Sequence, residues 1–178
     1  LSSIIKICGL DKHVITIDDI VFKIGPRINA AGRMEVDSDD ENAAPSGGHS
    51  AVYLMVARDE EVASEYGAFI DTCNQDRKNI DRSITQEAHE IIESRPELKN
   101  RKSTVIYNPK WMKGIVGIVA SRLIETYYRP TVVLTMSNGY VTGSARSVPG
   151  FDLYQAVESC ADLLENFGGH IYAAGLTM

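Results

Sequence analysis

The chain of 178 residues has few cysteines and no long apolar run, and both absences narrow the class of protein. Its three cysteines, Cys8, Cys73 and Cys160, are widely separated and odd in number, so the sequence indicates neither a disulfide framework nor a zinc site. The longest apolar stretches, such as 115–120, fall far short of the ~20 residues that a membrane-spanning helix needs. No charged-then-apolar leader opens the chain. We therefore expect a cytoplasmic protein with no membrane partner.

The charge of the chain excludes a further class. A net charge of −6 argues against a protein that coats nucleic acid without selectivity. The charge is unevenly distributed, because residues 1–94 contain nine Lys or Arg against eighteen Asp or Glu, whereas residues 95–130 contain eight against two. The second stretch therefore predicts either a local basic face or a solvated surface that balances the acidic half.

What the sequence does contain is three glycine-bearing segments that suit an anion. Residues 143–147 (Gly-Ser-Ala-Arg-Ser) offer a guanidinium and two hydroxyl groups, and residues 168–175 (Gly-Gly-His-Ile-Tyr-Ala-Ala-Gly) offer flexible backbone and an imidazole. Residues 111–122 place Lys113 and Gly114 at the start of an apolar helix, where free N–H groups and the helix dipole favour negative charge. Three such segments in one small domain predict a ligand that carries phosphate.

The first half of the chain is predicted to be helical. Residues 2–8 and a segment capped at 16–19 are typical of short helices, and the acidic, glycine-containing residues 35–50 are typical of a surface loop. Between residues 59 and 94 apolar side chains recur at spacings of three, four and seven, which indicates a single helix about 50 Å long. We expect this helix to be a strut between two bodies, with few contacts at its polar middle.

Beyond residue 95 strands and helices alternate. The pattern predicts a strand at 103–107, a helix at 114–127, a strand at 131–135, a tight turn at 137–139, a strand at 140–147, a helix at 151–167 ended by Gly168-Gly169, and a last strand that begins at His170. This order predicts an α/β domain, a small mixed β-sheet flanked by helices. The expected parts are a helical segment with its acidic loop at 1–58, the long linker helix at 59–94, and this domain at 95–178.

Several segments together resemble the RecJ family of single-strand-specific 5′ to 3′ exonucleases, within the DHH phosphoesterase superfamily. The segments are 24–33 (Ile-Gly-Pro-Arg-Ile-Asn-Ala-Ala-Gly-Arg), 111–122, 143–147, 149–152 (Pro-Gly-Phe-Asp) and 168–175, and they occur in family order at family spacing. The resemblance covers nearly the whole chain. It implies that residues 95–178 form a DHHA1 domain, the part of these enzymes that binds substrate.

The resemblance also implies a catalytic half that this sequence does not contain. RecJ-like enzymes hold two divalent ions, usually Mn²⁺ or Mg²⁺, on aspartates and histidines of an N-terminal DHH domain. No Asp-His-His or Asp-His-Asp occurs here, and the four histidines have no acidic companions at ligand spacing. The chain also starts at Leu1 rather than Met. We therefore expect an excised piece that works beside its own DHH domain, binds no metal ion itself and is inactive alone.

By resemblance, two motifs of the last strands contact the substrate. Ser144 and Arg146 match a Ser-x-Arg that helps to hold the 5′-terminal phosphate, and the alternative is an edge-strand arginine paired with an acid such as Asp152. His170 matches a Gly-Gly-His that faces the metal centre and donates a hydrogen bond to the scissile phosphate. The alternative for His170 is a core histidine after a helix cap.

A third motif lies in the first half of the chain, where the composition of residues 24–33 suggests a loop. The resemblance places its polar residues in the binding cleft, and the alternative is that Arg27 and Asn29 fasten the loop to the long helix. Trp111 either stacks on a base or packs internally, and Met112 stands where many relatives have histidine. The predicted substrate-binding residues are Arg27, Asn29, Arg33, Lys113, Gly114, Gly143, Ser144, Arg146, Gly168, Gly169 and His170, with His170 as a supporting catalytic group.

The expected function is that of the substrate-binding part of an exonuclease for single-stranded DNA, acting in DNA repair and recombination. Two other functions stay open. One is a sibling phosphoesterase that acts on short oligonucleotides or cyclic dinucleotides, which the long helix and the Pro-Arg-Ile-Asn segment disfavour. The other is a non-catalytic binding or scaffold module that kept the fold and lost the chemistry.

Overall fold

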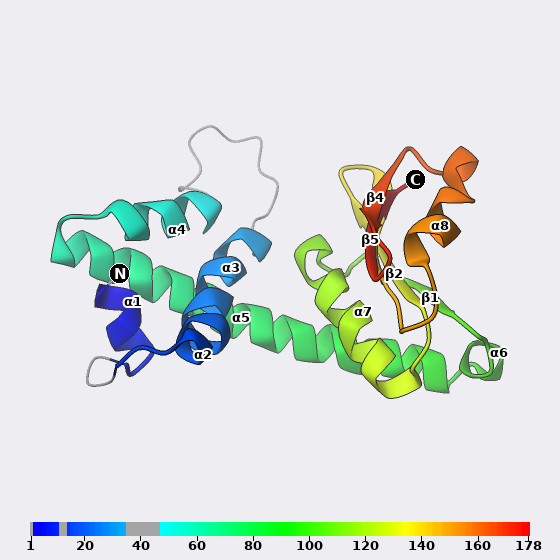
Figure 1. Ribbon diagram of the computed structural model, residues 1–178, viewed down its shortest axis with the longest axis horizontal. Helices are drawn as coiled ribbons and strands as arrows, with labels where there is room; N and C mark the ends of the chain where they lie inside the picture. The colour runs from blue at the N-terminus through cyan, green and yellow to red at the C-terminus, as the bar shows by residue number, and fades with distance from the viewer. Residues whose placement is uncertain (1, 11–13, 35–46) are drawn as a thin grey trace. The chain divides into compact units, whose positions relative to one another are not determined.

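The computed structural model describes residues 2–10, 14–34 and 47–178, which divide into two compact units, Leu1–Asn79 and Ile80–Met178 (Figure 1). The boundary falls inside helix α5 (Glu60–Glu93), so residues 60–79 of this helix belong to the first unit and residues 80–93 to the second. Most of the predicted acidic loop lies outside the described residues. Its last four residues, 47–50, are not loop but the start of helix α4 (Gly47–Val56).

The first unit is helical and begins with α1 (Ser2–Ile7) and α2 (Ile17–Asp19). As the sequence predicted, Thr16 caps α2: its hydroxyl accepts from the Asp19 amide, and the Asp19 carboxylate accepts from the Thr16 amide. A π-helical turn, η1 (Ile20–Ile24), then leads into α3 (Gly25–Arg33). The apolar core of this unit contains Ile4, Leu10, Ile24, Ala31, Ala51, Leu54, Ala63 and Ile70.

The expectation of a loop at residues 24–33 is wrong, because α3 covers Gly25–Arg33. Pro26 lies in the first turn of this helix, where its missing N–H breaks no hydrogen bond. Ala30 and Ala31 are fully buried and hold the inner side of α3 against the rest of the unit. Burial of this alanine pair therefore outweighs the low helix propensity of the flanking glycines.

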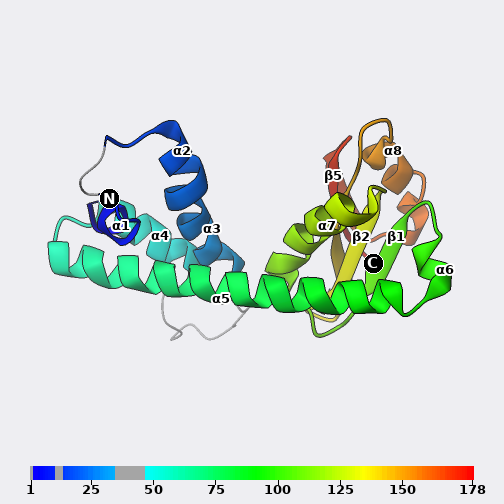
Figure 2. The ribbon, with the colours of Figure 1, turned by 90° about the horizontal axis from the view of Figure 1, so that it is seen from below.

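Helix α5 is continuous over 34 residues, as the apolar spacing predicted (Figure 2). At ~1.5 Å per residue it spans about 50 Å. Its middle is not exposed on all sides: Asn74 is only 1% exposed, whereas Gln75 and Asp76 are exposed. The expectation that the middle of this helix makes few contacts is therefore wrong at Asn74. Within the described parts of the chain, no helix has the length and apolar composition to cross a membrane.

The second unit contains a five-stranded mixed sheet, which confirms the predicted α/β class. Its strand order is β1-β2-β3-β5-β4, with β1 parallel to β2 and the other neighbours antiparallel. At the turn between β2 and β3, Asn138 and Gly139 both have positive φ, 50° and 80°, as a tight hairpin requires. The strands are β1 (Thr104–Tyr107), β2 (Thr131–Ser137), β3 (Tyr140–Arg146), β4 (Asn166–His170) and β5 (Ala173–Thr177), and the helices are α6 (Pro96–Lys99), α7 (Lys113–Tyr127), α8 (Leu153–Glu158) and the 3₁₀ turn η2 (Ala161–Leu163).

The last forty residues differ from the prediction. The expected helix at 151–167 ends at Glu158, and residues 166–170 form a strand instead. Gly168 and Gly169 therefore lie within β4 rather than capping a helix, and His170 ends that strand rather than starting the last one. Leu164 and Phe167 pack on the same core as Leu153, and residues 166–170 pair with β5 through their backbone.

The two faces of this sheet carry different helices, α7 on one side and α8 on the other (Figure 1). The α8 face is apolar, and its core contains Leu134, Ala145, Leu153, Val157, Ala174 and Leu176. On the α7 face, Ile106 and Val133 are buried in β1 and β2, whereas Gly168, His170 and Gly175 of β4 and β5 are exposed. The α7 face is thus covered at one edge and open at the other.

Candidate substrate-binding site

Strand register brings three of the predicted side chains to the α7 face. Ser144 of β3 pairs with Gly175 of β5, which pairs with Gly168 of β4, and Arg146 likewise shares a row with Ala173 and His170. Paired residues present their side chains on the same face of a sheet. Arg146 and His170 are two strands apart, about 10 Å, and only the methyl group of Ala173 lies between them. The two side chains can therefore flank a group that lies over β5.

Helix α7 borders this site through Gly117, which has no side chain. A Cβ at Gly117 would lie 3.0 Å from Arg146 Nη2 and 3.1 Å from Ser144 Oγ. Arg146 Nη1 donates to the carbonyl of Ala145, 2.8 Å away. Ser144 and Arg146 are half-buried where the sheet meets α7. The guanidinium and the hydroxyl are therefore next to each other, as binding of one anionic group requires.

Asp152, the acid considered as an alternative partner of Arg146, has a role of its own. Its Oδ1 accepts a hydrogen bond from the Gln155 amide at 3.0 Å and so caps the N-terminus of α8.

His170 lies exposed at the end of β4, so the alternative of a core histidine after a helix cap is wrong. The Tyr172 amide donates to His170 Nδ1 at 3.3 Å. Because Nδ1 is the acceptor, this contact assigns the proton of the neutral ring to Nε2. His170 therefore presents an N–H donor that can reach a phosphate oxygen.

The predicted glycines divide between the two faces. Gly168 lies on the α7 face, where an added Cβ would meet nothing within 4 Å. Gly143 and Gly169 share rows with Leu134 and Ala174 and so lie on the α8 face. At both of these positions a Cβ would overlap a neighbouring strand. Gly168 leaves bare backbone at the candidate site, whereas Gly143 and Gly169 allow close strand packing.

Lys113 and Gly114 are the first two residues of α7, and Lys113 is exposed. No side chain caps this helix end at Met112. Trp111, just before it, is 4% exposed, and its Nε1 donates to Glu87 at 2.8 Å, so it packs internally rather than stacking on a base. Glu87 also accepts from Asn108 at 2.6 Å. The helix start therefore follows a loop that Glu87 of α5 holds in place.

The remaining predicted residues belong to the first unit, on α3. Arg27 Nε donates to Asp71 of α5 at 2.8 Å and Arg27 Nη1 donates to the Lys23 carbonyl at 2.9 Å. This is the fastening role that the sequence left open. Asn29 and Arg33 are exposed and lie four residues apart, on one side of α3. Substrate contact by these three residues stays a prediction.

The basic stretch 95–130 is not a face of uniform free charge, because three of its cations are paired within the unit. Arg122 forms a two-point ion pair with the buried Asp81, at 2.8 and 2.7 Å, which raises the pKa of Arg122. Arg129 is 8% exposed and donates to Thr104 and to three main-chain carbonyls. Lys99 pairs with Glu93 at 2.5 Å. These contacts stabilise the unit rather than attract a ligand.

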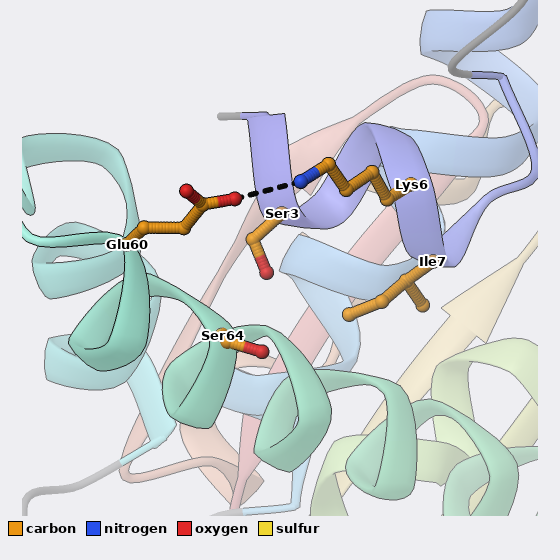
Figure 3. A pocket seen from close by; sticks show the side chains of 5 residues that line it. All are labelled: Ser3, Lys6, Ile7, Glu60 and Ser64. Carbon is orange, nitrogen blue, oxygen red and sulfur yellow. Dashed lines mark hydrogen bonds and ion pairs between the residues drawn. The ribbon is translucent and has the colours of Figure 1, made fainter.

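Metal-ligand clusters and pockets are two further kinds of candidate site. Among residues 2–10, 14–34 and 47–178, no group of three or more His, Cys, Asp or Glu side chains could hold a metal ion. A pocket of about 120 Å³ between α1 and α5 is lined by Ser3, Lys6, Ile7, Glu60 and Ser64 (Figure 3). Lys6 and Glu60 pair across it at 2.7 Å, and both are largely exposed, so their charges offset each other in water.

Comparison with known proteins defines the class of the second unit. Residues 100–178 match the family model described as the DHHA1 domain. The chain is 37% identical over 180 residues to the single-stranded-DNA-specific exonuclease RecJ of Bacillus subtilis, across 100% of this chain and 21% of that protein. It is 31% identical over 188 residues to RecJ of Dickeya dadantii, across 100% of this chain and 30% of that protein.

Solved structures agree. RecJ from Thermus thermophilus in complex with Mn²⁺ matches with a TM-score of 0.79 and 26% identity, over 98% of this chain and 24% of that one. An exonuclease RecJ bound to manganese matches with a TM-score of 0.74 and 25% identity, over 99% and 43%. Residues 100–178 are thus similar to a DHHA1 domain, and the chain as a whole is RecJ-like. It spans between 21% and 30% of the length of these two curated relatives.

Sequence reasoning missed three residues around the site. Gly117 lies three residues after Gly114 in α7, and this helical spacing was the available signal. Gly175 extends the bare backbone of Gly168 onto β5, which only the strand pairing reveals. Glu87, in the long helix, carried no signal, because nothing in its neighbourhood predicted its contact with Trp111.

Proposed function

We propose that this chain is the substrate-binding part of an exonuclease for single-stranded DNA. In this proposal, Ser144 and Arg146 hold the 5′-terminal phosphate, His170 donates to the phosphate where cleavage occurs, and digestion runs 5′ to 3′. The biological setting would be DNA repair and recombination. The RecJ names of the relatives support the substrate class, and they describe proteins several times longer than this chain.

The observation that carries the proposal is the juxtaposition on the α7 face. A guanidinium, a hydroxyl and an exposed imidazole stand beside bare strand backbone, in the domain that matches DHHA1. A phosphate that approached over Ala173 would meet donors on both sides and little steric obstruction beneath. The positive charge of the guanidinium favours an anionic ligand over a neutral or apolar one.

A terminal phosphate suits this site better than an internal one. The terminal group carries up to two negative charges and three free oxygens, whereas a phosphodiester has one charge and two free oxygens. Arg146 and Ser144 can therefore form more charge-assisted hydrogen bonds with the end of a strand than with its middle. Such a site would select a strand end, which is what an exonuclease needs.

Metal chemistry, in this proposal, belongs to a DHH domain outside the chain. RecJ from Thermus thermophilus has been solved in complex with Mn²⁺ and with Mg²⁺. The described residues of this chain include no group of three or more His, Cys, Asp or Glu that could hold such an ion. We expect the 178-residue chain alone to leave single-stranded DNA intact in Mn²⁺ or Mg²⁺. Chelator-sensitive digestion by the purified chain would contradict this division of labour.

The test compares two single-stranded oligonucleotides of one sequence, one with a 5′-phosphate and one with a 5′-hydroxyl. Their binding to the 178-residue chain is measured by fluorescence anisotropy, with the label at the 3′ end. We expect tighter binding of the phosphorylated strand, and we expect Arg146→Ala to remove about 2 to 4 kcal/mol of that preference. The matched control is Arg82→Ala, which removes the same charge from an exposed position on α5.

Two results would contradict the assignment. If Arg146→Ala weakened both strands equally, Arg146 would be a general backbone contact rather than a terminal-phosphate ligand. If it weakened neither strand while circular dichroism showed a folded protein, Arg146 would have no part in binding. Loss of preference in Arg82→Ala to the same degree would show that net charge alone explains the effect.

A further inference from the structure

Gly117 occupies a position where glycine needs an explanation. It lies inside α7, between Val116 and Ile118, and glycine in a helix interior is less stable than alanine. Its backbone is ordinary α-helix, since Gly117 is not among the described residues with positive φ. The conformation of the backbone therefore does not require glycine here.

The space around Gly117 favours glycine instead. The missing Cβ would lie 3.0 Å from Arg146 Nη2, 3.1 Å from Ser144 Oγ and 3.4 Å from Ser144 Cβ. Contacts of 3.0 to 3.4 Å are tighter than most that a Cβ makes, so the two side chains would have to shift by a few tenths of an ångström. Both of the atoms that a Cβ would displace belong to side chains of the candidate phosphate site.

The guanidinium of Arg146 has little room to move away. Its Nη1 donates to the Ala145 carbonyl at 2.8 Å, on its own strand, while Nη2 lies against α7 at Gly117. A Cβ at Gly117 would push Nη2 from the helix and strain the hydrogen bond at Nη1. The planar fork would then shift relative to the Ser144 hydroxyl.

We propose that Gly117 is a positioning residue that sets the preference of this site for a terminal phosphate monoester. This inference rests on the proposed function of Ser144 and Arg146. Glycine lets α7 approach the sheet closely enough to hold both side chains in one geometry before the ligand arrives. A site organised in advance loses less conformational entropy on binding, and misplacement of a charged donor is costly. Gly117 acts through Arg146 and Ser144 and does not itself touch the ligand.

The test is Gly117→Ala, measured with the 5′-phosphate and 5′-hydroxyl strands and with the single variant Arg146→Ala and the double variant in parallel. We expect Gly117→Ala to lower the ratio of the two affinities about tenfold and to leave affinity for the 5′-hydroxyl strand unchanged. In the Arg146→Ala background the same change is expected to have a smaller effect on the ratio, because only the contact with Ser144 remains. The matched control is Gly32→Ala on α3, whose Cβ would meet nothing within 4 Å.

The outcomes separate this inference from the proposed function. If Arg146→Ala lowers the ratio and Gly117→Ala does not, Gly117 has no positioning role. If Arg146→Ala itself leaves the ratio unchanged, the proposed function fails. Should Gly117→Ala prevent folding, the double variant Gly117→Ala with Ser144→Ala removes the 3.1 Å contact, and it is compared with Ser144→Ala alone. An unchanged ratio between those two would also overturn the inference.

Discussion

The two faces of the sheet in the second unit use the same strands for opposite purposes. On the α8 face, Ala145, Ala174 and Leu176 are buried against α8 and form the apolar core. On the α7 face, Ser144, Arg146 and His170 come from the same sheet and reach the edge of the covered region. Strand geometry separates the two sets, because successive side chains point to opposite faces.

The contrast between the two faces indicates which substitutions change stability and which change binding. Substitutions on the α8 face remove buried apolar contacts, so they act on folding first and on binding only as a consequence. Substitutions on the open part of the α7 face remove groups that the core does not need. Variants on each face of the sheet, and one at a half-buried tyrosine of α7, can test that separation.

Leu176→Ala tests the α8 face. Leu176 is 8% exposed and packs in the core with Leu134 and Leu153. Its truncation leaves a cavity, and we expect the free energy of unfolding to fall by about 2 to 5 kcal/mol. Urea denaturation followed by circular dichroism measures the change, with Thr177→Ala, next along the strand on the other face, as the control. Equal losses in the two variants would break the distinction between the faces.

Gly169→Ala tests the close packing of β4 and β5 at their hairpin. Gly169 has a φ of 156°, and a Cβ there would overlap the Ala173 carbonyl. We expect a loss of about 1 to 3 kcal/mol of stability, since few residues other than glycine adopt this conformation. Gly168→Ala, where a Cβ meets open space, is the control and is expected to unfold near the wild-type urea concentration. A control as unstable as Gly169→Ala would contradict the open surface around Gly168.

The third prediction concerns a half-buried polar group of the same unit, Tyr127. Tyr127 donates to Glu93 at 3.1 Å and lies 3.1 Å from His89 Nδ1. Burial, reinforced by the Glu93 carboxylate, raises the pKa of Tyr127 from 10.0 to about 12. A raised pKa favours the neutral phenol in the folded state, so its contribution to stability is complete below pH 10 and is lost as the pH rises toward 12.

Ultraviolet difference absorbance against pH measures this ionisation. Tyr127→Phe should remove an ionisation near pH 12, and it should flatten the loss of stability between pH 10 and 12. Tyr140→Phe, at an exposed position in β3, is the control. If Tyr127→Phe left the absorbance change above pH 10 as it is in the wild type, the raised pKa of Tyr127 would be contradicted.

Much of the fold was predictable because it depends on local signals. The capping box at Thr16, the helix over Glu60–Glu93 and the Asn138-Gly139 turn all follow from short-range patterns, and the structure confirms them. The predictions that are wrong concern segments whose secondary structure depends on packing against residues far away in the sequence. Residues 166–170 become a strand because β5 offers a partner and Phe167 joins the core, neither of which a window of neighbouring residues contains.

The candidate site shows the same division. Sequence could select Ser144, Arg146 and His170 as residue types that suit a phosphate, since their motifs are contiguous. It could not separate Gly168 from Gly169, adjacent residues that the strand places on opposite faces. It also placed Arg27 in a loop, whereas the ion pair with Asp71 fastens it to α5 as part of a helix.

The class of the fold, the long helix and the residue types of the candidate site follow from the sequence alone. Hydrophobic period, turn residues and donor groups can be recognised from neighbouring positions in the chain. Only the tertiary structure decided that Gly117 of α7 borders Arg146 and Ser144, and that His170 shares their face of the sheet. These relations depend on strand register and on the closeness of a helix to a sheet. Both result from packing among residues far apart in the chain.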